Sequence, residues 1–279
     1  MTTDAPALRR IEVSHPLRGF GGLVVRELLV WFPWRWLILT ATSAGVFALI
    51  YIPWSIAEAN TLGTLLYVFF GFWLAVMLVS VVSLTEGAVL GEIEGGTASW
   101  LVAMPVARPA VIIAKFVGAA MGIAAVVFTV GGAAYPILSS ASQRGITAFN
   151  GDELTEALSS PIGMWGRFTT LATPGEWTLV LLATAAVLIF VAAVMVLFGA
   201  MLHSRVVVFG LGLGVAGVFG GLAAAGAFAA ASPAGLIGAV VDTLQAQPAT
   251  FATPLLATLG WTAVVLMLGV WRFNRRELP

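Results

Sequence analysis

The chain has 279 residues, of which 60% are hydrophobic and only 9% are charged. Soluble domains carry about 25% charged residues, so this composition excludes an ordinary water-facing surface and indicates a membrane protein. The net charge is zero, which gives no argument for nucleic acid as a partner. Cysteine is absent, which excludes disulfides and thiolate metal sites, and the two histidines, His15 and His203, lack metal-ligand spacing.

The N-terminal segment, residues 1–35, contains five arginines and no early apolar core or cleavage site, so we expect no removable signal peptide. Within it, Leu17–Trp36 mixes basic residues with apolar residues and tryptophans, a pattern typical of a helix that lies in the membrane interface. Pro33 is expected to break this helix where the chain turns into the membrane. The alternative is a first membrane helix that simply begins earlier.

Residues 36–271 are predicted to form the membrane domain. A helix needs about 20 apolar residues to cross the hydrocarbon core. Six windows free of Asp, Glu, Lys and Arg are long enough, which predicts an all-α integral membrane protein with six transmembrane helices. The expected helices are Trp36–Ile52, Leu62–Leu84, Pro109–Leu138, Trp177–Met201, Val206–Ala231 and Pro254–Trp271.

The positions of Lys and Arg predict the orientation of these helices. With the N-terminus inside, the cytoplasmic segments, including the tail 272–279, hold 11 basic residues, whereas the outer connections hold only Arg144 and Arg167. Both termini are therefore expected in the cytoplasm. The outer connections are expected at residues 53–61, 139–176 and 232–253, and Gly151–Ser160 in the second is expected to form a short surface helix or a packed loop.

The predicted spans carry no motif for chemistry. There is no H-E-x-x-H motif, no G-x-S-x-G motif and no pair of carboxylates inside a span, so we expect no catalytic residue and no metal site. Ion-coupled transporters usually place ionisable residues within their spans, but here Glu86, Lys115 and Arg205 lie at predicted cytoplasmic ends. Lys115 is the only lysine and has no P-loop around it, so any ATP would bind to a separate polypeptide.

The segment 86–115, between the second and third spans, is predicted to form a cytoplasmic hairpin. Its first part continues the second helix until Gly95 and Gly96, which are expected to interrupt it. Thr97 can then N-cap a short helix, and Pro105 discourages its continuation. The predicted order is therefore helix, break, short helix, break, helix.

This hairpin has two interpretations. Glu86, Glu92 and Glu94 precede the break, and Arg108 and Lys115 follow it, so the segment can be a folded loop with internal ion pairs. It can equally be a docking site for a soluble partner. In that case Trp100, Leu101 and Met104 would be its apolar anchors.

The hairpin resembles the signature of ABC-2-type transporter permeases, in which glycine and acidic residues precede Gly-Gly-Thr, a Met-Pro-Val-x-Arg run and a lysine seven residues later. The matching positions are Gly91, Glu92, Glu94, Gly95, Gly96, Thr97, Pro105, Arg108, Lys115 and Gly118. The sequence departs from the pattern at Ala107 and Pro109, which flank the arginine. The six-span layout extends the resemblance over the whole chain, and the N-terminal helix resembles the connecting helix of that family.

The resemblance implies a permease subunit of a bacterial ABC exporter in the cytoplasmic membrane. Two such subunits, identical or related, would pair, and each would dock a cytoplasmic ATP-binding subunit that holds ATP and Mg. The implied docking residues are Glu92, Glu94, Gly95, Gly96, Thr97, Trp100, Leu101, Met104, Pro105, Arg108 and Lys115. The residues themselves leave open a stand-alone channel or secondary transporter, and a membrane scaffold or immunity protein that transports nothing.

A glycine face runs along the fifth predicted span. Gly210, Gly214, Gly217 and Gly221 fall on one side of a helix. Small residues allow helix backbones to approach closely in lipid. This face is expected to pack either on another helix of the same chain or, as the resemblance implies, on a second subunit.

Overall fold

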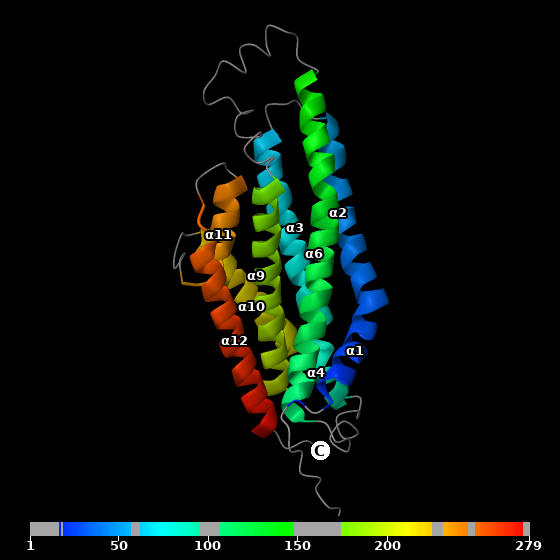
Figure 1. Cartoon of the computed structure of the whole chain (residues 1–279), viewed down its shortest axis with the longest axis vertical. Coiled ribbons are helices and arrows are strands. Elements are labelled where there is room, and N and C mark those ends of the chain that lie inside the picture. The colour runs from blue at the N-terminus through cyan, green and yellow to red at the C-terminus, as the bar shows by residue number, and fades with distance from the viewer. Residues whose placement is uncertain are drawn as a thin grey trace, which may run out of the picture.

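The computed structural model describes residues 17, 19–56, 62–94, 107–147, 174–224, 231–244 and 249–275, and every element in these ranges is a helix (Figure 1). The sequence prediction of an all-α chain is therefore confirmed for the described residues. In chain order the elements are α1 (Phe20–Val30), η1 (Trp31–Arg35), α2 (Trp36–Ile56), α3 (Leu62–Thr85), α4 (Gly87–Glu94), α6 (Arg108–Thr147), α9 (Pro174–Met201), α10 (Arg205–Ala224), α11 (Pro233–Leu244) and α12 (Ala252–Arg275).

Helix α9 is the centre of the bundle. It contacts α3, α6, α10, α11 and α12, and Figure 1 shows it between α6 on one side and α12 on the other. Its sequence is apolar on all sides, which is typical of a helix surrounded by other helices. Two neighbours of α9, α11 and α12, have a proline in their first turn, where the missing N–H leaves no helical hydrogen bond unmade.

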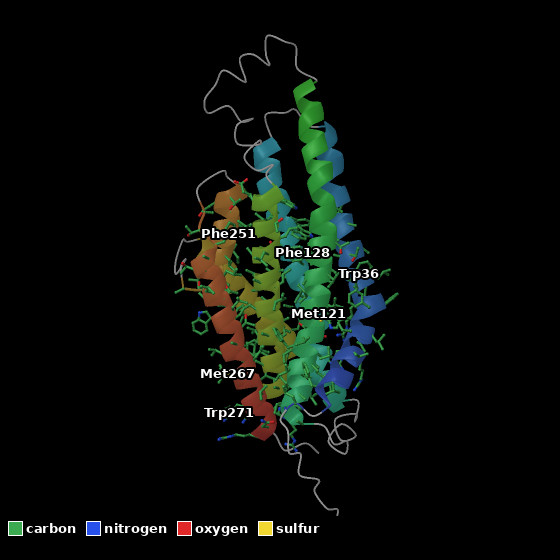
Figure 2. The ribbon with its side chains drawn as sticks, in the orientation of Figure 1. Trp36, Met121, Phe128, Phe251, Met267 and Trp271 are labelled. Atoms are coloured by element: carbon green, nitrogen blue, oxygen red, sulfur yellow. The ribbon has the colours of Figure 1, made fainter. Side chains whose placement is uncertain are left out.

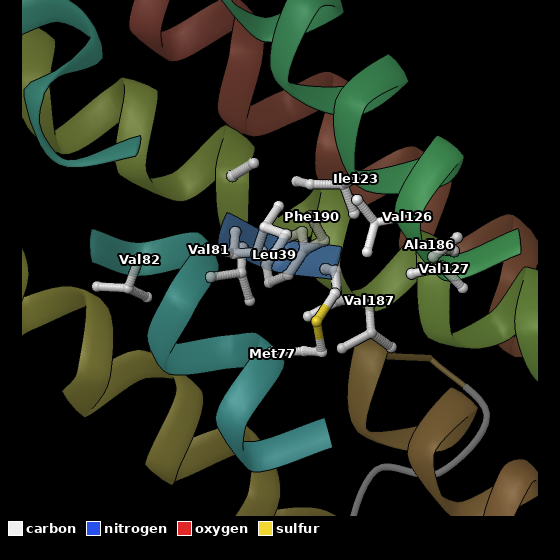
Figure 3. Close-up of a cluster of buried hydrophobic side chains, with 14 of the residues drawn as sticks. Leu39, Met77, Val81, Val82, Ile123, Val126, Val127, Ala186, Val187 and Phe190 are labelled. Atoms are coloured by element: carbon white, nitrogen blue, oxygen red, sulfur yellow. The ribbon is translucent and has the colours of Figure 1, made fainter. Parts of the chain in front are cut away.

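The main apolar core lies where α2, α3, α6 and α9 meet (Figure 3). Leu39 of α2, Met77 of α3 and Ile123 of α6 are fully buried there. The Ser43 hydroxyl donates a hydrogen bond to the Met77 sulfur at 2.9 Å, which satisfies a buried polar group in this core. The core therefore ties the first two long helices to the central one.

Five described helical segments are long and apolar enough to cross a membrane. They are Phe70–Gly91, Arg108–Ala133, Gly175–Met201, Arg205–Leu222 and Ala252–Arg275. Within α2, Trp36–Val46 is apolar but shorter. These segments fit a multi-pass membrane protein, while the count of six spans and their orientation stay predictions.

The outer side of α12 has the character of a lipid-facing surface. From Leu256 to Trp271 its exposed large side chains are all apolar: Leu256, Leu259, Trp261, Val264, Met267, Leu268 and Trp271. Figure 2 shows Met267 and Trp271 along this helix. At its end, the Arg275 guanidinium lies 4.5 Å from the centre of the Trp271 ring, and a tryptophan beside arginines is typical of a membrane–water boundary.

Helix α11 lies within residues 232–253, where the sequence analysis predicted an outer connection and no helix. Pro233–Leu244 is a helix with buried residues along most of its length, while its position outside the membrane stays a prediction. It packs against α9, α10 and α12. Twelve residues are too few for a full span, so a length criterion finds no helix here.

The first helix, α1, lies along the beginning of α6 rather than across the ends of the bundle (Figure 1). Gly19 precedes α1 with a left-handed backbone, at a φ of 81°, which glycine adopts without strain. A kink at Phe32 then separates α1 from α2. The predicted break of the helix at Pro33 is therefore confirmed, while a position of α1 in the membrane interface stays a prediction.

Candidate functional site

Five helix ends meet at one end of the bundle, which we call the hairpin end. Helix α4 ends there at Glu94, α6 begins at Arg108, the turn from α9 to α10 spans Leu202–Ser204, and α12 ends at Arg275. Residues 95–106, between α4 and α6, are the tip of the predicted hairpin and lie outside the described residues. The described arms of the hairpin are therefore α4 and the start of α6.

A small apolar cluster fixes both arms to the bundle. It joins Val89 of α4, Ile112 of α6, Val196 and Ala200 of α9, and Phe273 of α12. The contact is close because Gly199 of α9 has no side chain. A Cβ atom added there would lie 3.1 Å from the Cβ of Val89. Because these side chains are closely packed, we expect a displacement of either arm to shift α9 and α12 as well.

An exposed ion pair joins the hairpin to the α9–α10 turn. The Arg205 Nε donates to the Glu94 carboxylate at 2.6 Å, and the two side chains are 46% and 44% exposed. The guanidinium lies over two glycines of α4, 3.7 Å from where a Cβ would stand on Gly87 and 3.4 Å on Gly91. The glycines thus leave the room in which Arg205 reaches Glu94.

A second contact joins the other arm to the end of α12. The Arg108 guanidinium donates a hydrogen bond to the backbone carbonyl of Asn274 at 3.3 Å. The last carbonyls of a helix have no partner within it, so a cation at this position is favourable. Arg108, which the resemblance assigns to docking, therefore also closes the C-terminal end of α12.

Lys115 is buried and forms an ion pair. The sequence analysis placed it at a predicted cytoplasmic helix end and did not predict this burial. Its Nζ lies 3.0 Å from a carboxylate oxygen of Glu27 in α1, and the two side chains are only 6% and 8% exposed. Glu27 was not among the predicted site residues. No local sequence pattern joins positions 27 and 115, because the pair forms only when α1 packs on α6.

Arg35 lies close to this pair. Its guanidinium lies 5.5 Å from the centre of the Trp31 ring, a cation–π distance. Burial lowers the pKa of Arg35, and the negative charge of Glu27 raises it. An arginine stays protonated under such shifts, so Arg35 places a further positive charge near Glu27.

The predicted docking residues divide into two groups. Glu94, Arg108 and Lys115 lie at or near the hairpin end, and Glu92 falls within α4. The others lie outside the described residues: Gly95, Gly96, Thr97, Trp100, Leu101, Met104 and Pro105. Their role in docking stays a prediction.

The predicted glycine face of α10 points away from the described part of the bundle. Gly210, Gly214, Gly217 and Gly221 are exposed, and no described atom outside α10 lies within 4 Å of where their Cβ atoms would stand. Gly212, on the opposite side, contacts Met195 and Val82 instead. Packing of the four glycines on another helix of the same chain is therefore not found among the described residues.

The described residues contain no group of three or more His, Cys, Asp or Glu side chains that could hold a metal ion. The bundle is held by apolar packing and by the few polar contacts above. These contacts connect the helices to one another mechanically.

Comparison with models of protein families and with curated protein sequences finds no match to this chain.

Proposed function

We propose that this chain is the permease subunit of an ABC-2-type ATP-driven transporter, an exporter of the bacterial cytoplasmic membrane. One observation carries the proposal: both arms of the hairpin are braced to the rest of the bundle. Helix α4 is joined to α9 and α10, and α6 is joined to α1, α9 and α12. A partner that pushes on residues 95–106 would therefore move several membrane helices together.

The environment of Lys115 supports a separate motor. A P-loop lysine must reach phosphates from an open loop. Lys115, the only lysine of the chain, is buried against Glu27 inside a helix pair. The ATP and Mg of the transporter would then be held by a cytoplasmic ATP-binding subunit docked at the hairpin end.

The open face of α10 supports pairing with a second copy of the chain. Alongside the four glycines, Leu211 and Val218 of α10 are exposed, and α3, which contacts α10, exposes Phe72 and Val79. Small residues permit close approach of two helices in lipid, where packing drives association. The substrate pathway would form between the two copies, lined by α3 and α10.

Co-purification with a P-loop ATPase from the native membrane tests the proposal. Gly96→Arg and Trp100→Asp place a charge at the hairpin tip, and we expect both to abolish recovery of the ATPase. Matched controls carry the same substitutions in the connection predicted on the other side of the membrane, Gly163→Arg and Trp165→Asp, and should retain it. Recovery of the ATPase with both hairpin variants would disprove docking at this hairpin.

Transport assays separate this function from its rivals. An exporter of this kind moves its substrate only with the ATPase and ATP present. Transport by the chain alone in proteoliposomes would instead establish a channel or secondary transporter. A chain that binds a partner and transports nothing would be a scaffold or immunity protein.

A further inference from the structure

Three successive turns, two in α1 and one at the start of η1, pack along one side of the beginning of α6, where most residues are small. Leu23 packs against Ala107, Ala110, Val111 and Ala114. One turn later Glu27 reaches Lys115 and lies over Gly118, and after another turn the Trp31 ring lies on Gly122. The two helices therefore run in the same direction, in a register that pairs position 27 with position 118.

Glycine makes this register specific. A Cβ atom on Gly118 would stand 2.7 Å from the Cβ of Glu27, closer than two such atoms approach. A Cβ on Gly122 would overlap the Trp31 ring. If α1 slid along α6 by one turn, the Trp31 ring would no longer lie against Gly122, where the missing side chain makes room for it. This steric fit therefore opposes sliding of α1 along α6. The ion pair between Glu27 and Lys115 opposes separation of the two helices.

The buried ion pair resists separation. Two charges that are more than nine-tenths buried have given up their water, and removal of either residue takes away the direct ion-pair partner of the other. If α1 swung away from α6, both Glu27 and Lys115 would have to find new partners. Lys115 lies in the second arm of the hairpin, so the pair joins that arm to α1, which leads through η1 into α2.

We propose that α1 and the first half of α6 form one rigid body, clasped by Glu27 and Lys115, so that movement of the hairpin carries the start of the first membrane helix with it. The evidence for the rigid body is the packing of α1 and Trp31 on α6 and the ion pair between Glu27 and Lys115. That a docked ATPase supplies the movement rests on the proposed function.

Distances between spin labels test the clasp without any partner. The chain has no cysteine, so Leu29→Cys on α1 and Met121→Cys on α6, which are 70% and 49% exposed, provide the only labelled sites. The labelled chain is diluted with unlabelled chain in lipid nanodiscs, so that distances within one copy are measured. A control pair, Leu182→Cys on α9 and Leu259→Cys on α12, reports a contact that does not involve Lys115.

We expect a single narrow distance distribution for the α1–α6 pair. Lys115→Met removes the ion-pair partner of the buried Glu27, and should cause loss of this narrow distribution while the control pair keeps its own. The double variant Glu27→Leu with Lys115→Met removes both charges, and should restore it. An unchanged distribution in Lys115→Met, or no recovery in the double variant, would overturn the clasp.

The same labels then test the movement. In the complex with the co-purifying ATPase, the distance from Leu29 to Met121 should be the same without nucleotide and in the ATP-bound state. The distance from Leu29 to Leu259 on α12 should change between the two states. A change between Leu29 and Met121 would show that α1 and α6 separate, which contradicts the rigid body. Failure of any ATPase to bind would instead contradict the proposed function and leave the nanodisc result standing.

Discussion

The two arms of the hairpin are each held by an ion pair, and the two pairs lie in opposite environments. Glu27 and Lys115 join α1 to α6 with both side chains almost completely buried, whereas Glu94 and Arg205 join α4 to α10 with both side chains nearly half exposed. Glycines make room for each pair, Gly118 for the first and Gly87 and Gly91 for the second. The exposed pair is the shorter of the two, at 2.6 Å against 3.0 Å.

The shorter ion pair is not expected to be the stronger one, because exposure to water decides how easily a pair separates. An exposed pair exchanges its partner for water at little cost, so it typically contributes about 0–1 kcal/mol. A buried pair cannot do so, because each charge would be left in an apolar surrounding. We therefore expect the α6 arm to be permanently attached to α1, and the α4 arm to be able to open at Arg205. The variants below test this contrast, from the largest effect to the smallest.

Lys115→Met should have the largest effect. Removing one partner of a buried pair costs about 3–5 kcal/mol, so the free energy of unfolding should fall by that amount in a titration from a mild into a denaturing detergent. Glu27→Leu combined with Lys115→Met removes both charges and should recover most of the loss. If Lys115→Met were as stable as the unaltered chain, the pair would not be buried in the membrane-embedded protein.

Gly122→Leu should come next. The added side chain would occupy the space of the Trp31 ring, and overpacking of this kind costs about 1–3 kcal/mol. Gly132→Leu is a matched control on the same helix, because no described atom outside α6 lies within 4 Å of its Cβ position. Equal free energies of unfolding for the two variants would show that α1 does not rest on α6 at Gly122.

Gly214→Leu together with Gly217→Leu should weaken pairing of two copies without affecting the fold of one. A loss of about 1.4 kcal/mol in association corresponds to a tenfold rise in the dissociation constant of the dimer. Size-exclusion chromatography with light scattering measures this change as a function of concentration. Gly260→Leu, at an exposed glycine of α12 with open space around it, is the control. A dimer that survives the α10 substitutions would have its interface elsewhere.

Most helices of the fold could be predicted from the sequence, because charge-free apolar windows in a membrane protein specify helices directly. The predicted Leu62–Leu84 and Trp177–Met201 correspond closely to α3 and α9. Boundaries were less predictable: Pro109–Leu138 was expected where α6 spans Arg108–Thr147. Helix α11 could not be found, since a twelve-residue apolar segment has the same composition as a connection next to a span.

The candidate site was predictable only where its signal is local. Glu94 and Arg108 could be placed beside the hairpin because they flank its breaks in the sequence. The partner of Lys115 could not, because Glu27 lies 88 positions away and the pair depends on the packing of α1. The sequence does contain one local signal of a close helix contact at this place. Gly118 and Gly122 are spaced as in GxxxG motifs, which mark close helix contacts in membranes.

Arg205→Met should have the smallest effect and the strongest dependence on salt. Because Glu94 stays in water when its partner is removed, the free energy of unfolding should fall by less than about 1 kcal/mol. Salt at about 1 M screens charges beyond roughly 3 Å, so the difference from the unaltered chain should shrink as salt is added. Glu94→Gln should act on the same interaction, and the double variant should lose no more than either single variant. A loss that persisted in high salt, or that added up in the double variant, would mean that Arg205 holds α4 by packing on Gly87 and Gly91 rather than by its charge. In that case both arms of the hairpin would be rigidly attached, and the contrast between them would disappear.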